Sequence, residues 1–281
     1  MLRMYLMKYK KGTALRLSEV EKLFPSKFLL INRHIRLTLL PLVLMFPFIA
    51  NAEGESDKEN NFLNLPGEFS ATVAFTTDYT FRGLTQNDEE PAIQGSLDYS
   101  LPVGDKISLY LGVWASNVDF NDSDEANTEF DWYGGFKYQI DKLSLDLGAL
   151  YYTYPGAASS LDYDYYEIQA VAGYDFEVAS LSASVNYTPE NFGKSGYAEY
   201  YKLAGEVPLQ KGFNLIGHIG RQQIDKESVF GKPDYTDWGI GLSYDFKGVD
   251  IKLEYIDTDL GKNECADGCD ARAILSVAKS I

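Results

Sequence analysis

The residues that could do chemistry in this chain are few. His218 is the one histidine beyond residue 52, and it lies in the segment FNLIGHIGRQQ. A histidine can act as the general base beside a serine nucleophile, but no G-x-S-x-G motif or comparable nucleophile motif accompanies His218. We therefore predict no catalytic residue, no cofactor and no enzymatic activity, and expect His218 to be a hydrogen-bonded polar residue.

Acidic residues gather in two segments. They are Asp119, Asp122, Asp124 and Glu125 in the first, and Asp257, Asp259, Asp267 and Asp270 in the second. Carboxylates at this density are the ligands that Ca²⁺ prefers. Neither segment matches the calcium-loop pattern D-x-[DN]-x-[DN]-G with a glutamate at position twelve. We predict solvated acidic loops that hold no metal; the alternative is that divalent cations bridge these carboxylates to the phosphates of lipopolysaccharide.

Cys265 and Cys269, in the segment CADGC, are the two cysteines of the chain. Their spacing, without a histidine or a further cysteine nearby, does not suit zinc. In an oxidising compartment such a pair forms a disulfide, whose small ring would rigidify the tip of a loop. Whether the chain reaches such a compartment depends on its N-terminal segment.

Residues 1–52 have the composition of an export leader. They carry nine Lys or Arg and two acids, whereas the whole chain has a formal net charge of −16. An uncharged apolar run at 37–50 ends in Ala50-Asn51-Ala52, which suits cleavage after Ala52. Two prolines and its short length argue against a retained membrane helix, which needs about 20 apolar residues. We predict an N-terminal extension plus a secretory signal peptide over 1–52, and hence the disulfide Cys265–Cys269.

Beyond a polar and disordered lead-in predicted at 53–66, apolar and polar residues alternate with a period of two. In 143–148, leucines alternate with Ser144, Asp146 and Gly148. This period is typical of strands with two different faces. Twelve such strands are predicted, at or near 68–81, 92–101, 107–117, 129–138, 143–152, 165–175, 180–188, 197–207, 213–222, 237–244, 249–255 and 272–281.

The links between these segments alternate in length. Short links such as 141–142 and 247–248 follow the even segments, and long polar links such as 82–91 and 257–271 follow the odd ones. A Greek-key sandwich has no reason to alternate in this way, whereas an up-and-down membrane barrel has tight periplasmic turns and longer extracellular loops. We predict an all-β, transmembrane, up-and-down antiparallel barrel of about 12 strands over 67–281, located in the bacterial outer membrane.

The polar face of such a barrel lines the lumen, where water or opposite charges solvate ionised groups. The predicted pore-lining residues are Glu129, Asp131, Lys137, Asp146, Glu167, Lys202, His218, Asp237, Lys252 and Glu254. Acids outnumber bases on this face, and acidic rings favour cations. Twelve strands enclose a narrow bore, so two interpretations stay open: a conducting lumen with a weak cation preference, or a lumen plugged by its own salt bridges and tyrosines.

Five segments of the sequence carry a family resemblance: FTTDYTFRGLTQNDEEPAIQG (75–95), GVWASNVDF (112–120), FDWYGGFKY (130–138), YYTYPG (151–156) and SASVNYTPENFG (182–193). They resemble the TorF family of porin-like proteobacterial outer-membrane proteins. The similarity covers roughly Phe69 to Ile281, and its most specific parts are 78–83 and 116–119. The resemblance implies an outer-membrane barrel and a pore, without an established substrate.

We therefore expect an outer-membrane porin-like channel for passive diffusion of small hydrophilic solutes, with a weak cation preference. The alternatives are a non-conducting structural or surface-binding barrel and, more distantly, an outer-membrane enzyme. Expected partners are outer-membrane lipid and lipopolysaccharide, small hydrophilic solutes or cations, and the barrel-assembly machinery, because 272–281 resembles the last strand that this machinery recognises. An acidic chain presents no basic surface for nucleic acid.

Overall fold

The structure is a computed structural model that describes residues 65–120 and 126–281. The predicted apolar run 37–50, the cleavage position after Ala52 and nearly all of the lead-in 53–66 lie outside the described residues, and these assignments stay predictions. Within the described part of the chain, no helix is long and apolar enough to cross a membrane.

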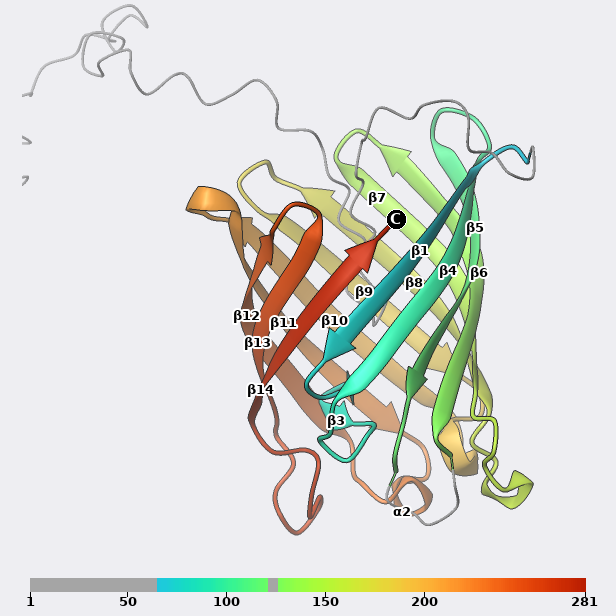
Figure 1. The fold of residues 1–281 in the computed structure, drawn as a ribbon. Coiled ribbons are helices and arrows are strands. Elements are labelled where there is room, and N and C mark those ends of the chain that lie inside the picture. Colours follow the sequence, from blue (N-terminus) through green and yellow to red (C-terminus); the bar gives the residue numbers. More distant parts are fainter. Residues whose placement is uncertain (1–64, 121–125) are drawn as a thin grey trace, which may run out of the picture. The chain divides into compact units, whose positions relative to one another are not determined.

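The described residues form a closed barrel of twelve antiparallel strands (Figure 1). The strands are β1 (Glu68–Thr76), β4 (Ala92–Pro102), β5 (Ile107–Asn117), β6 (Thr128–Ile140), β7 (Leu143–Thr153), β8 (Tyr165–Asp175), β9 (Ser180–Thr188), β10 (Ala198–Pro208), β11 (Phe213–Ile224), β12 (Tyr235–Asp245), β13 (Val249–Thr258) and β14 (Arg272–Ser280). Each strand pairs with the next one along the chain, and β1 pairs with β14 to close the barrel. The predicted fold class and strand number are confirmed.

The links alternate between the two ends of the barrel. Tight links such as 141–142 join strands at one end, where the chain also ends after β14 (Figure 1). The long links lie at the other end and contain the short helices η1 (Ser159–Leu161), η2 (Phe192–Lys194) and α2 (Glu227–Phe230). A further turn, η3 (Gln210–Gly212), lies in a short link. By the rule for outer-membrane barrels, the end with tight links is periplasmic and the end with long links is extracellular.

The two faces of each strand differ in polarity. On β5, Leu109 and Leu111 point outward and are 45% and 59% exposed, whereas Trp114 points inward and is 2% exposed. Outward aromatic rings lie towards both ends of the strands: Trp132 pairs across strands with Tyr151 near the extracellular end, and Phe69 contacts Tyr99 near the periplasmic end. An apolar outer band with aromatic rings at both edges is the surface that lipid solvates. The barrel is therefore a membrane-spanning one.

The first long link departs from the predicted boundaries. The strand predicted over 68–81 ends at Thr76, and residues 77–91 turn inward as a separate two-stranded sheet, β2 (Thr80–Phe81) and β3 (Leu84–Thr85). Arg82 and Gly83 form the turn, with φ values of 51° and 81°. Two central residues with positive φ match the twist of a tight hairpin. We call residues 77–91 the inward hairpin.

Candidate functional site

All ten predicted pore-lining residues point to the inside of the barrel. The cross-strand registers place them on the same face as buried inward residues such as Trp114. The structure brings them together in three groups. The first is Glu129, Asp131 and Glu167, the second is Lys202, His218, Asp237, Lys252 and Glu254, and the third is Lys137 and Asp146.

Arg82, at the tip of the inward hairpin, is the residue that ties the hairpin to the first group. Its Nη2 donates to both carboxylate oxygens of Glu167, at 2.7 and 2.6 Å, and its Nη1 donates to Oε1 of Gln222 at 2.8 Å. The side chains of Arg82 and Glu167 are 5% and 1% exposed. The tip of the hairpin therefore lies inside the barrel against β8 and β11, and a buried ion pair holds it there.

Aromatic rings enclose the Arg82 guanidinium. Its Cζ lies 4.5 Å from the ring centroid of Phe81 and 4.5 Å from that of Tyr200. Burial alone would lower the pKa of Arg82, but the charge of Glu167 outweighs burial and the pKa of the guanidinium is raised. Arg82 therefore stays charged at every relevant pH.

The N-terminal part of the hairpin packs against β5 and β6. Tyr79 donates from its hydroxyl to Oε2 of Glu129 at 3.1 Å, and its ring meets that of Trp114 edge-on at 5.2 Å. Tyr154 donates to the other oxygen of Glu129 at 3.2 Å. The inward hairpin thus contacts β5 and β6 through Tyr79, and β8 and β11 through Arg82 at its tip.

The second group surrounds His218. Its Nε2 lies 3.1 Å from Oδ2 of Asp237, and its Nδ1 lies 3.3 Å from Oε1 of Glu254. Lys252 Nζ lies 2.9 Å from Oε2 of Glu254. Both ring nitrogens of His218 thus face carboxylate oxygens; a neutral imidazole can donate to one of them and an imidazolium to both. This arrangement balances charge in the lumen.

Three inward tyrosines lie flat along the wall, a feature that the sequence analysis missed. Tyr200 on β10 crosses over Gly220 on β11 and donates to Asp237 on β12 at 2.8 Å. A Cβ on Gly220 would collide with the Tyr200 hydroxyl. An inward-facing glycine on the strand next to an inward-facing tyrosine is the sequence signal that could have predicted this arrangement.

The same arrangement recurs on the opposite wall. Tyr110 crosses Gly135 and Gly148 and donates to Asp146 at 2.8 Å, and Tyr133 crosses Gly112 and donates to Asp98. A ring that lies along the wall over a glycine takes less of the bore than a ring that projects into it. The carboxylates beside these rings keep the lumen polar.

The cysteines lie outside the lumen wall, in the last extracellular loop. Cys265 and Cys269 are joined by a disulfide, and both pack against Leu84 of the inward hairpin. The acidic segment around Asp119 is described only in part, because residues 121–125 lie outside the described ranges. Among residues 65–120 and 126–281, no group of three or more His, Cys, Asp or Glu is arranged to hold a metal ion.

A closed twelve-strand barrel with an apolar exterior, a charged interior and an inward extracellular hairpin defines a β-barrel protein of the bacterial outer membrane. Within that class the chain belongs to a bacterial family of unknown function, Gcw_chp, whose family model matches residues 63–281. No curated protein matches the chain.

Solved structures of outer-membrane channels are similar to the chain. An outer-membrane channel from Pseudomonas putida F1 is 11% identical with a TM-score of 0.47, covering 77% of this chain and 95% of the other. The NanC porin is 9% identical with a TM-score of 0.47, covering 75% and 98%. The KdgM porin is 11% identical with a TM-score of 0.47, covering 75% and 99%.

Proposed function

We propose that this protein is a porin-like channel for passive diffusion of small hydrophilic solutes, with a weak cation preference, and that the inward hairpin forms its constriction. The observation that carries the proposal is the charged inner wall of a barrel whose outer wall is apolar. Ionised groups on a membrane strand are tolerated where water or an opposite charge solvates them. A polar lumen that spans the bilayer is the setting for diffusion of polar solutes.

The charges of the wall support the cation preference. Acids on the inner wall that lie away from the inward hairpin include Asp98, Asp146 and Glu206. The bases on this wall, such as Lys252, lie within reach of acids. Excess carboxylate favours cations over anions in a narrow pore.

The inward hairpin supports a constriction at the extracellular half. Three wall residues beside it, Glu129, Glu167 and Tyr200, are at most 2% exposed. Inward residues nearer the periplasmic end, such as Tyr110 and Lys137, keep part of their surface exposed. Passage is therefore controlled where Arg82 crosses the lumen.

A non-conducting barrel with a structural or surface-binding role is the second candidate. The observation in its favour is the Arg82–Glu167 ion pair, because a buried pair that spans the lumen resists the passage of solute. The resemblance to the TorF family of porin-like proteins favours the channel. Enzymatic activity at His218 is the third and most distant alternative.

Single-channel recording on refolded protein in a planar bilayer tests the proposal. We expect discrete conductance steps. In a potassium chloride gradient, we expect a reversal potential with the sign that results when potassium permeates more readily than chloride. A barrel that inserts but gives no steps would exclude the channel. A reversal potential of the opposite sign would exclude the cation preference alone. Binding of lipopolysaccharide by a non-conducting barrel would favour the second candidate.

A further inference from the structure

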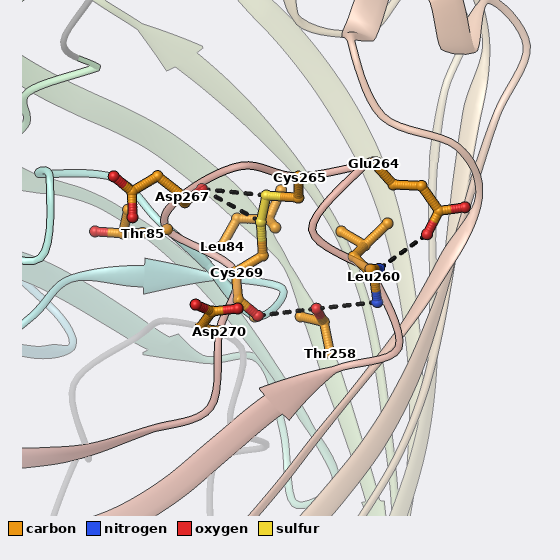
Figure 2. Close-up of a disulfide and its surroundings, with 12 residues drawn as sticks. Leu84, Thr85, Thr258, Leu260, Glu264, Cys265, Asp267, Cys269 and Asp270 are labelled. Atoms are coloured by element: carbon orange, nitrogen blue, oxygen red, sulfur yellow. Dashed lines mark hydrogen bonds between the residues drawn. A yellow bond between two sulfur atoms is a disulfide. The ribbon is translucent and has the colours of Figure 1, made fainter.

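The last extracellular loop, residues 259–271, lies against the inward hairpin (Figure 2). Leu84 of the hairpin packs in one buried cluster with Tyr235 and with both cysteines of the loop. Leu84, Cys265 and Cys269 are 9%, 7% and 3% exposed. The disulfide therefore forms part of an apolar contact between two loops that are far apart in the sequence.

Hydrogen bonds join the same two loops. The backbone N–H of Thr85 donates to the carbonyl oxygen of Gly268 at 2.9 Å. Arg272, the first residue of β14, donates from Nη2 to that same carbonyl at 2.8 Å and to the carbonyl of Gly83 at 3.3 Å. The carbonyl oxygen of Gly268 thus accepts hydrogen bonds both from the hairpin backbone and from the arginine that borders the loop.

The position of Gly268 depends on the backbone of the loop. Its φ is +76°, and a Cβ at this residue would lie 2.5 Å from Cγ2 of Thr85. Glycine adopts this conformation without strain, and other residues do not. The disulfide encloses Gly268 in a small ring between Cys265 and Cys269, and Thr258 donates from its hydroxyl to the carbonyl of Cys269 at 3.0 Å. Closure of the ring therefore fixes the carbonyl that binds the hairpin.

We propose that the disulfide loop 259–271 is a latch that holds the inward hairpin across the lumen, and that opening the disulfide releases the hairpin. The effect on conduction rests on the proposed function, whereas the position of the hairpin does not. A dithiol reductant opens the latch by giving two electrons and two protons to the S–S bond, which yields two thiols, and is itself oxidised to a disulfide. The ring is small, so its opening frees the loop while the twelve strands stay paired.

Two measurements on the full-length folded protein test the latch. The first is tryptic cleavage of the Arg82–Gly83 bond, followed by mass spectrometry, because Arg82 is 9% exposed inside the barrel. The second is single-channel conductance. Both are made on the wild type before and after treatment with a dithiol, on the double variant C265S/C269S, and on Leu84→Ser, which keeps the disulfide and removes the apolar contact. The matched control is Lys262→Ala, in the same loop but exposed.

We expect cleavage after Arg82 to rise at least about tenfold, as for an opened segment whose cleavage tracks its open population. We expect conductance to rise by about twofold, because the bore of a twelve-strand barrel is narrow and the hairpin occupies part of it. The dithiol should have no further effect on C265S/C269S, and Lys262→Ala should behave as the wild type. Reoxidation should restore the protected state.

The outcomes separate the two proposals. If Arg82–Gly83 stays protected after reduction and in C265S/C269S, the latch is wrong whatever the conductance. If the bond becomes cleavable while no form of the protein conducts, the latch stands and the channel fails. If the double variant does not fold, reduction of the folded wild type and Leu84→Ser still decide the question.

Discussion

Arg82 and Glu167 meet inside the barrel although 85 residues separate them in the sequence. Arg82 comes from the inward hairpin and Glu167 from β8, so their contact couples an extracellular loop to the wall of the lumen. The side chains of both residues are buried. The ion pair therefore contributes to the position of the hairpin, and its loss would leave the Arg82 charge without an opposite charge.

Glu167→Gln should detach the tip of the hairpin while the barrel persists. Breaking a buried ion pair by removing one partner costs about 3–5 kcal/mol, because the remaining charge is uncompensated. We expect that cost to appear in hairpin docking, measured as tryptic cleavage after Arg82, and not in the heat-modifiable gel shift of the barrel. Glu206→Gln is the control: it makes the same change on an inward glutamate of β10 and should leave the hairpin protected. Equal cleavage in the two variants would contradict the role of the pair.

Arg272→Lys should weaken the base of the hairpin. Arg272 donates from Nε to Asp78 at 2.6 Å while its other nitrogens serve the carbonyls of Gly268 and Asp270 at 2.8 Å each. A lysine ammonium lacks the planar set of donors of a guanidinium and cannot donate hydrogen bonds to all of these partners at once. We expect hairpin protection from hydrogen exchange at Thr85 to fall by about 1–3 kcal/mol, the cost of losing hydrogen bonds to a charged group.

Arg221→Lys is the control for Arg272→Lys. Arg221 lies on the outer face of β11 with its side chain 44% exposed, and its nearest acid, Asp259, is 3.7 Å away. Such an exposed pair contributes little. Unchanged protection at Thr85 is expected here, and a loss similar to that of Arg272→Lys would show that the measurement reports general loosening of the loops.

The residues of the inner wall could be predicted from the sequence because successive side chains on a strand point to opposite faces. The face of each residue therefore depends only on whether its position along the strand is odd or even. A shift of one residue reverses every side chain, so one buried or lipid-facing position fixes the rest. For this reason Lys137, Asp146 and His218 could be placed on the inner face before any contact was known. The strand number followed from the alternation of link lengths, which is also a local property.

The inward hairpin could not be predicted in the same way. Arg82 stands in a polar link and its partners, Glu167 and Gln222, lie on distant strands, so no local pattern connects them. One signal was present: Phe81 and Leu84 flank the dipeptide Arg82-Gly83, as in a two-residue hairpin turn. Its direction, into the lumen, depends on tertiary contacts alone.

Gly220→Ala should disturb the inner wall. The Tyr200 ring lies over Gly220, so a methyl group there forces the ring away from Asp237 and from Arg82. Overpacking of this kind costs about 1–3 kcal/mol. We expect a lower thermal midpoint and easier cleavage after Arg82.

Gly217→Ala, three residues earlier on the same strand, is the control for Gly220→Ala. Gly217 lies on the outer face, where an added Cβ would lie 3.3 Å from the carbonyl oxygen of Gly239. It should cost less and leave cleavage after Arg82 unchanged. If both variants behaved alike, the flat tyrosine would have no special role.

Asp146→Asn should lower the cation preference of the channel. Asp146 is an inward carboxylate on β7, half-buried beside Tyr110, and asparagine keeps an oxygen that accepts the tyrosine hydrogen bond. Asp146 is one of several acids that together set the electrostatic potential of the lumen. Its loss should therefore lower the permeability ratio of potassium to chloride by less than about twofold. The reversal potential in a salt gradient measures this ratio. Glu199→Gln, on the outer face of β10, removes the same charge and should leave the ratio unchanged.

Leu111→Arg should impair insertion of the barrel because Leu111 lies at mid-strand on β5 with its side chain 59% exposed on the outer face. An arginine on the lipid-facing side near the bilayer midplane costs about 2–4 kcal/mol. Val103→Arg is the matched control, since Val103 is 53% exposed but lies in the short link between β4 and β5, where water reaches the side chain. Folding yield into lipid vesicles, read from the gel shift of the folded form, should fall for Leu111→Arg alone. If Leu111→Arg inserts as well as Val103→Arg, the outer face of β5 does not face hydrocarbon, and the membrane assignment of the barrel would fail with it.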